Sequence, residues 1–291
     1  MATIAQSVAD VCRAAKRASR ELARLDAGTR DAALNAIADA IDARAAEILD
    51  ANARDMEAAS ADLSPAFRDK MRLDEARVAA MAEGVRAIVA LRDPVGEVIE
   101  GFRLPNGLDV RKVRVPLGVV AVVYEARPNV TIDCTALALK SGNAIVLRGS
   151  SQVANSNAVL ASIATEAATA AGVPEGAVGL VAGGGREELA ELATQEGLVD
   201  LIVPRGGEGL KAALKAVATV PVIYAASGNC HVYVDAGADL DTAEAIVLNA
   251  KTQRPGVCNA AETLLVHRDA AAQFLPRALR ALREAGVELR A

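Results

Sequence analysis

The strongest constraint on the fold is a repeated alternation of short aliphatic runs with helical patterns between residues 119 and 225. The aliphatic runs are, in order, "VVAVVY", "AIVLRG", "AVGLVAG", "VDLIVPRG" and "VPVIYA". The helical patterns between them cover residues 130–140, 152–171, 186–196 and 208–219. Continuous rather than alternating apolar residues are typical of strands buried on both faces. The sequence therefore predicts a doubly wound parallel α/β sheet, a class that commonly binds a nucleotide at the carboxyl ends of its strands.

Two different patterns precede this region. Residues 3–91 are predicted to be mostly helical, with Thr29 as a helix N-cap. Their apolar positions recur at helical spacing on one face, namely Leu34, Ile37, Ile41 and Ile48. Residues 95–115 instead alternate apolar and polar side chains around Asn106-Gly107, which predicts an antiparallel hairpin arm. Because a two-stranded ribbon alone is marginal in water, we expect it to pair with something else, such as another subunit.

A second α/β domain is expected to begin near residue 229. Its pattern is strand, helix, a loop containing Cys258, strand and helix, and the chain stops as a further strand, "GVELRA", begins. We therefore expect a cofactor-binding domain over residues 1–228. The start of a catalytic domain, left incomplete, would occupy residues 229–291.

Charge and composition exclude several classes of partner. The net charge is −5 with both signs interspersed, and the absence of a basic block argues against nucleic acid. No apolar run approaches the ~18 residues of a membrane span, and the charged amphipathic N-terminus is no secretory signal, so a cytoplasmic protein is expected. The four cysteines form no CxxC pair and the two histidines complete no zinc pattern, so reduced thiols and no metal site are expected.

Candidate phosphate-binding positions lie where strands meet helices. There is no P-loop, but Gly183-Gly184-Gly185 and Gly206-Gly207 each stand between a strand and a helix. Such glycines either let backbone N–H groups approach a phosphate or simply make a turn, and the residues alone leave both interpretations open. Arg148 ends a strand, and no acid follows it through Ser150 to Gln152. An arginine without a nearby carboxylate favours a cofactor with a phosphorylated ribose.

Cys258 is the candidate nucleophile. It follows a loop with Pro255 and Gly256 and has Lys251 and Arg254 nearby, whose positive charges would favour a thiolate without a histidine. Cys12 and Cys134 lie in apolar helical patterns and are expected in the core. The residues alone leave Cys258 open between a nucleophile and a buried thiol.

Four long motifs carry a resemblance to a known family. They are "GVVAVVYEARPNVTIDCTALALKSGNAIVLRGS", "LIVPRGGEGL", "GNCHVYVD" and "NAKTQRPGVCNAAETLLV". In this order they resemble the γ-glutamyl phosphate reductases, a branch of the aldehyde dehydrogenase superfamily, along nearly the whole chain. The resemblance implies an aldehyde-dehydrogenase-like fold and NADPH-dependent reduction of L-glutamyl 5-phosphate to glutamate 5-semialdehyde and phosphate, in proline biosynthesis.

The resemblance also implies roles for individual residues. Cys258 would be the nucleophile that forms a thioester, and Asn129, with the backbone N–H of Cys258, would form the oxyanion hole. The cofactor NADP(H) would be bound by Arg148 and Ser150 and by the glycine pair Gly206 and Gly207. Arg254 is our candidate for contacting the leaving phosphate. A homo-oligomer in the full-length protein and an association with glutamate 5-kinase are further expectations.

Two departures from the superfamily define the alternatives. Hydrolytic aldehyde dehydrogenases carry a glutamate base where this chain has "IYAASGNCHV", so no acid is available there to activate water, as expected for a reductase. Glu262 is expected to be structural. Family members are also longer, so we expect a fragment or a truncated product of such an enzyme. A hydrolytic aldehyde dehydrogenase and a catalytically inactive nucleotide-binding fragment are the alternatives.

Overall fold

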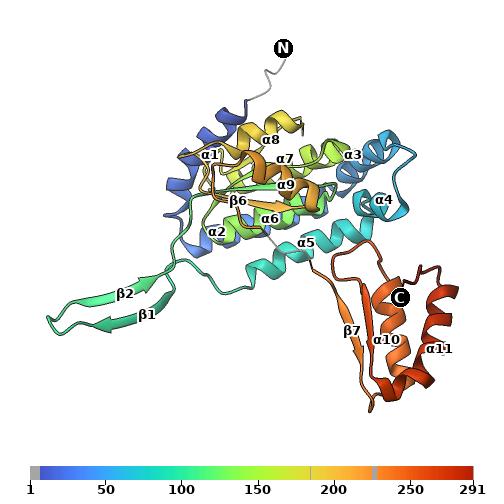
Figure 1. Ribbon diagram of the computed structural model, residues 1–291. Coiled ribbons are helices and arrows are strands. Elements are labelled where there is room, and N and C mark those ends of the chain that lie inside the picture. The colour runs from blue at the N-terminus through green and yellow to red at the C-terminus, as the bar shows by residue number, and fades with distance from the viewer. Residues whose placement is uncertain (1–6, 184, 225–227, 291) are drawn as a thin grey trace. The chain divides into compact units, whose positions relative to one another are not determined.

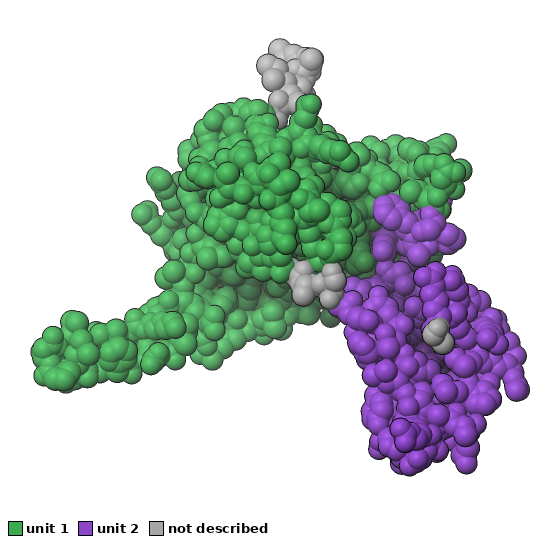
Figure 2. Space-filling view, viewed as in Figure 1, with its two compact units in different colours: residues 1–63, 71–225 green, residues 64–70, 226–291 purple. Residues whose placement is uncertain are grey.

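The protein divides into two compact units. The computed structural model describes residues 7–183, 185–224 and 228–290. Unit 1 comprises residues 1–63 and 71–225, and unit 2 comprises residues 64–70 and 226–291 (Figure 2). The N-terminus of the predicted 3–91 helical region and Gly184 of the triple-glycine cluster lie outside the described residues. Within the described residues, no helix is long and apolar enough to cross a membrane.

Unit 1 contains a parallel sheet with the predicted doubly wound arrangement. Its strands are β3 (Val119–Tyr124), β4 (Ala144–Arg148), β5 (Val178–Leu180) and β6 (Leu201–Arg205), in the spatial order β5-β4-β3-β6. Strands β4 and β5 are added on one side of β3, and β6 pairs with β3 in parallel on its other side. The direction in which strands are added therefore reverses between β3 and β6. In sheets of this class, ligands bind in the crevice beyond the carboxyl ends of the strands at such a reversal.

Of the expected strand "VPVIYA", residues 220–224 are described and form one bridge, and Ala225 lies outside the described residues. Val222 pairs with Ile202 beside β6, with Ile202 donating to the carbonyl of Pro221 and Ile223 donating to the carbonyl of Ile202. Pro221 has no N–H to donate, and the segment lies at the sheet edge beside a single neighbour. The prediction of a full fifth strand was therefore wrong, although its position next to β6 fits the doubly wound order.

Helices form a layer on each face of the sheet (Figure 1). The connections between strands are α6 (Asn129–Lys140), α7 (Ala154–Ala170), preceded by the 3₁₀ turn η1 (Ser151–Val153), α8 (Arg186–Ala193) and α9 (Glu208–Val217). Helices α6 and α7 contact each other, and α8 contacts α9. Strand β4 is buried along its whole length and β3 almost so, which explains the continuous apolar runs.

The N-terminal helices complete both layers. They are α1 (Val8–Leu22), α2 (Ala27–Ala43), α3 (Ala45–Ala58) and α5 (Glu75–Val89), and α1 packs on β4 and β5 while α2 packs on α6 and α7. The predicted apolar face is buried, with Leu34, Ile41 and Ile48 fully inside. The N-cap prediction was wrong: Asp26 caps α2, and its Oδ1 accepts from the backbone N–H of Thr29 at 2.8 Å.

Buried ion pairs tie the N-terminal helices to α6. The Arg30 side chain is 3% exposed and its Nη2 lies 2.7 Å from Asp93. Its Nη1 donates to the carbonyl of Lys140 at 3.1 Å. The Nζ of Lys140 in turn lies 2.6 Å from Asp31 and donates to the carbonyl of Val89. The buried cations Arg30 and Lys140 are therefore both paired with carboxylates, as burial requires.

The predicted hairpin arm is present. Strands β1 (Val98–Arg103) and β2 (Asp109–Val113) pair antiparallel, and Gly107 adopts φ +88° in the turn. Within the described residues these two strands pair only with each other, and the arm extends away from the rest of unit 1 (Figure 1). Several large apolar side chains of the arm are exposed, namely Val98, Ile99, Phe102, Leu108, Val113 and Val115.

Unit 2 has a small core of its own. Strands β7 (His231–Val234) and β8 (Thr263–Val266) pair in parallel and pack against α10 (Leu240–Thr252) and α11 (Arg268–Glu284) around Phe274. Most of α4 (Pro65–Met71) belongs to this unit. The expected strand "GVELRA" is not formed over residues 286–290, the part of it that the structure describes.

Candidate functional site

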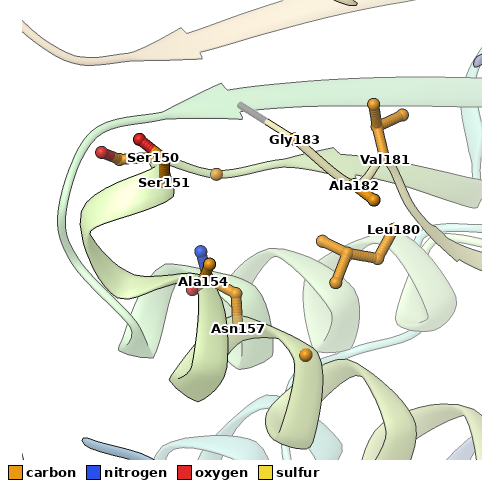
Figure 3. Close-up of a pocket in the computed structure, with 10 residues that line it drawn as sticks. Ser150, Ser151, Ala154, Asn157, Leu180, Val181, Ala182 and Gly183 are labelled. Atoms are coloured by element: carbon orange, nitrogen blue, oxygen red, sulfur yellow. The ribbon is translucent and has the colours of Figure 1, made fainter. Parts of the chain in front are cut away.

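A cavity of about 240 Å³ opens at the carboxyl ends of β4 and β5. Figure 3 shows its walls: Ser150 and Ser151 on one side, Ala154 and Asn157 of α7 below, and the end of β5 opposite. Ser150 Oγ accepts from the backbone N–H of Gln152 at 3.3 Å and thereby caps η1. The predicted cofactor residue Ser150 therefore lies in a cavity where hydroxyl groups and a helix start face the space. These are groups that recognise phosphate and ribose oxygens.

Gly149 and Asn157 line the floor of the cavity, and a buried chain of hydrogen bonds runs beneath it. The Tyr124 hydroxyl and Thr131 Oγ1 are 2.7 Å apart, and Thr131 Oγ1 donates to Asn157 Oδ1 at 3.1 Å. Gly149 lies directly over this chain: a Cβ there would be 3.0 Å from the Tyr124 ring and closer still to the Asn157 amide. Burial raises the pKa of Tyr124, so this hydroxyl stays protonated. The glycine is thus required by packing and leaves the cavity open.

A buried carboxylate fixes the start of α7. Asp55 on α3 is 3% exposed, and its two oxygens accept from the backbone N–H groups of Asn155 and Ser156 and from both of their side chains, at 2.6–3.1 Å. The negative charge lies at the positive end of the helix dipole. One wall of the cavity is therefore held by a residue about a hundred positions away in sequence.

Arg148 does not line the cavity. It is 8% exposed, and its Nη2 donates to the carbonyl of Gly185 at the start of α8. Its Nε has no hydrogen-bond partner among the described residues. Burial lowers the pKa of Arg148, and the nearby Glu188 carboxylate opposes that shift. Arg148 is thus a cation with an unsatisfied donor beside the cavity, which is suited to binding an anionic ligand. Its side chain would have to turn towards the cavity to do so.

Gly206 and Gly207 stand at the start of α9, as the resemblance implied. Their backbone already has a hydrogen-bond partner, because Glu125 Oε1 accepts from the N–H of Gly207 at 2.8 Å. A Cβ on Gly206 would lie 2.8 Å from the same carboxylate. Glu125 follows β3 and Gly206 follows β6, so this contact spans the point where the strand order reverses. The carboxylate of Glu125 therefore lies at the helix start where the resemblance places a diphosphate.

Asn129 is the first residue of α6, close to the same end of the sheet. Its Nδ2 donates to Asp133 Oδ2 at 2.8 Å, one helical turn along. Burial raises the pKa of Asp133, while the Asn129 hydrogen bond and the positive charge of Arg205 oppose that shift. One Nδ2 hydrogen is thus held by Asp133, and the amide keeps a second hydrogen with which it can donate.

Cys258 lies on a turn-rich loop of unit 2 between α10 and β8. It is exposed, whereas Cys12 is buried and Cys134 and Cys230 are partly buried. Arg254 on the same loop donates from Nη2 to Asp69 Oδ2 at 3.0 Å, with both side chains about half exposed. The loop therefore presents Cys258 to solvent and carries a cation whose present partner is a carboxylate that an anionic ligand could replace.

Three contacts were not foreseen from the sequence. They are those of Glu125 with Gly207, of Asp133 with Asn129, and of Cys230 with the Cys258 loop. Cys230 Sγ donates to the carbonyl oxygen of Cys258 at 3.3 Å, and the backbone N–H of Cys230 donates to Glu262 Oε2 at 3.1 Å. Glu262 thus joins the end of the loop to the start of β7.

The sequence and structure comparisons define the class of protein. The profile of the aldehyde dehydrogenase family matches residues 2–289, and the chain belongs to this family. Relatives that it matches over nearly its whole length include γ-glutamyl phosphate reductases. That of Kineococcus radiotolerans is 56% identical over 99% of this chain and 67% of its own length. That of Thermobifida fusca is 51% identical over 99% of this chain and 69% of its own length.

Solved structures agree with this assignment. The crystal structure of the γ-glutamyl phosphate reductase from Thermotoga maritima matches with a TM-score of 0.87 and 40% identity, over 97% of this chain and 69% of that one. The chain therefore spans about two thirds of the length of these relatives. The resemblance drawn from the sequence motifs and the predicted fold class are confirmed.

Proposed function

We propose that this chain supplies the cofactor-binding unit and the nucleophile of an NADPH-dependent reductase that converts L-glutamyl 5-phosphate to L-glutamate 5-semialdehyde and phosphate. The relationship to γ-glutamyl phosphate reductases is the observation that carries the proposal. The exposure of Cys258, alone among the four cysteines, supports its role as nucleophile.

The residues of unit 1 fit a phosphorylated dinucleotide. Ser150 and Ser151 line the cavity at a helix start, and the adjacent Arg148 has a buried donor that no described residue satisfies. No carboxylate lies among the cavity-lining residues, and the nearby Glu188 carboxylate faces the Arg148 cation. Gly206 and Gly207 would hold the diphosphate at the start of α9. We propose NADP(H) as the cofactor on this basis.

The acyl transfer requires a thiolate and an oxyanion site. The Cys258 thiolate attacks the acyl carbon, the C–O bond to phosphate breaks, and a thioester remains on Cys258. The free amide hydrogen of Asn129 and the backbone N–H of Cys258 would stabilise the tetrahedral oxyanion, and one such donor is worth about 3 kcal/mol. Arg254 would exchange Asp69 for the departing phosphate. NADPH, when bound, supplies the hydride that takes the thioester to the aldehyde level.

A reductase differs from a hydrolytic enzyme in having no base that activates water against the thioester. Residues 223–232 contain no acid that could activate water, and Glu262 is engaged with the backbone of Cys230. A hydrolytic aldehyde dehydrogenase needs such a base. The proposed reductase needs no such base, because phosphate leaves when the thioester forms and hydride, not water, then attacks the thioester.

The test is run in the reverse direction. Purified chain, NADP⁺, phosphate and glutamate semialdehyde should yield NADPH absorbance, and Cys258→Ala should abolish it. Oxidation of the aldehyde without phosphate would instead indicate a hydrolytic enzyme. NADPH binding without turnover in either direction would indicate an inactive nucleotide-binding fragment. Binding is followed by NADPH fluorescence, with NADH as the matched comparison, and Ser150→Ala should weaken NADPH more than NADH.

The hairpin arm supports a proposal about assembly. Its apolar side chains are exposed, including Phe102 on β1 and Leu108, which directly precedes β2. We expect a second copy to cover them, because a ribbon of two strands is marginal by itself. Light scattering should give more than one copy per particle, and Phe102→Ser with Leu108→Ser should reduce it to one. Association with glutamate 5-kinase stays a prediction from the family resemblance.

A further inference from the structure

Two of the four cysteines lie together in unit 2. Cys230 Sγ donates to the carbonyl oxygen of Cys258 at 3.3 Å, so the Cys230 sulfur contacts the very residue that carries the exposed thiol. We propose that Cys230 is a resolving thiol: when peroxide oxidises Cys258, the two residues form a reversible disulfide.

The local backbone holds Cys230 in place beside a loop that can adjust. The carbonyl of Cys230 accepts from the backbone N–H groups of Glu262 and Thr263 at 2.9 and 3.1 Å, and its own N–H donates to Glu262 Oε2. Cys230 is thereby fixed to the first residue of β8. Cys258 lies four positions before Glu262 on an exposed loop made of turns. A side-chain rotation at Cys258 with a small loop adjustment is the change that S–S bonding requires.

The other two thiols are poor competitors. Burial raises the pKa of Cys12 to about 11, with the Glu191 carboxylate adding to the shift. Burial likewise raises the pKa of Cys134 to about 11, with a contribution from Asp133. Both stay protonated near neutral pH, and the thiol form is unreactive towards peroxide. Among the cysteines, Cys258 alone is exposed.

The chemistry balances with one peroxide molecule. The Cys258 thiolate attacks an oxygen of hydrogen peroxide, an S–O bond forms, the O–O bond breaks, and hydroxide leaves to give a sulfenic acid. The Cys230 thiol loses its proton and attacks that sulfur, an S–S bond forms, the S–O bond breaks, and water leaves. The two thiols lose two electrons, which reduce the peroxide to water. A dithiol reductant reverses the bond.

Formation of the bond is measured on the thiols themselves. Purified chain is treated with a small excess of hydrogen peroxide, alkylated, and digested with trypsin without reduction. Cys230 then lies on the peptide 216–251 and Cys258 on the peptide 252–268, because the Arg254–Pro255 bond resists cleavage. We expect these two peptides to be joined, with Cys12 and Cys134 alkylated, and dithiothreitol to separate them.

Cys230→Ser distinguishes a resolving thiol from a residue that only hydrogen-bonds. The serine hydroxyl keeps a donor for the Cys258 carbonyl but cannot form a disulfide. In this variant Cys258 should progress to sulfinic and sulfonic acids, whereas Cys134→Ser should behave as the unmodified chain. Over-oxidation of Cys258 at the same rate with and without Cys230, or linkage between chains rather than within one, overturns the inference.

The regulatory meaning of the bond rests on the proposed function. If Cys258 is the nucleophile, peroxide should remove reductase activity and dithiothreitol should restore it, and Cys230→Ser should lose activity irreversibly. If the disulfide forms in a chain that shows no turnover, the thiol pairing is supported and only the proposed reductase function is contradicted. If the chain turns over but forms no disulfide, the function is supported and the thiol pairing is contradicted.

Discussion

Gly149→Ala tests whether the cavity floor is as tightly packed as its geometry indicates. Gly149 does not adopt a left-handed φ, so alanine is allowed by the backbone and only the side-chain space is at issue. The new Cβ would be 3.0 Å from the Tyr124 ring and closer to the Asn157 amide. Overpacking costs about 1–3 kcal/mol, and displacing Asn157 breaks its buried bond with Thr131 at a similar cost. We expect a loss of about 2–6 kcal/mol.

The assay is thermal unfolding together with NADPH titration. For a unit of this size the loss corresponds to a fall in Tm of roughly 5–20 °C. NADPH affinity should also fall, because Asn157 lines the cavity. The control is Gly84→Ala in α5, where a Cβ meets nothing within 4 Å and alanine should stabilise the helix by about 0.5–1 kcal/mol. If Gly149→Ala unfolds at the same temperature as the unmodified chain, the packing argument is refuted.

Three further predictions concern charged groups. Glu125→Gln removes the anion that occupies the start of α9 and should tighten NADPH binding two- to five-fold, about 0.3–1 kcal/mol; weaker binding in fluorescence titration would show that the carboxylate contacts the cofactor instead. Asp55→Ala should cost about 2–4 kcal/mol in urea unfolding, more than the loss expected for the exposed cap Asp26→Ala, and equal losses would contradict the role of burial. Because burial raises the pKa of Asp133, the native state binds its proton more tightly than the unfolded chain. Its stabilising effect is therefore full below the unfolded pKa and is lost as pH rises through the native one, so the unmodified chain should lose stability relative to Asp133→Asn as pH rises from 3.5 to 7, and a constant difference would contradict this.

The sheet and the hairpin arm were predictable because their signals are local. Strands β3 and β4 are buried on both faces, so continuous aliphatic runs identify them wherever they pair. The turn at Asn106-Gly107 requires a positive φ, and the glycine in the sequence indicates this because glycine adopts such a φ without strain. The segment "VPVIYA" has the same apolar character but contains Pro221 and lies at an edge. Its neighbours in space, which the sequence does not give, decided how much of it pairs.

The site was predictable in its positions and not in its contacts. Ser150, Gly206 and Asn129 all follow strands or open helices at the same end of the sheet, as the alternation of strands and helices implies. Asp133 could also have been found, since a helix that starts at Asn129 puts position 133 on the same face. Glu125 could not, because its partner is 82 residues away in sequence and is chosen by the pairing of β3 with β6.

The long-range polar contacts of unit 1 also bear on when the chain can fold during synthesis. Asp55 finds its partners at a sequence separation of 100 residues, and Lys16 pairs with Asp200 across 184. Arg30 meets the Lys140 carbonyl across 110. At a synthesis rate of about 5–20 residues per second, these groups remain without their partners for roughly 5–40 seconds. The N-terminal helices are synthesised first but gain these hydrogen-bond partners only later. A nascent chain halted before the sheet exists should therefore expose them to chaperones and proteases.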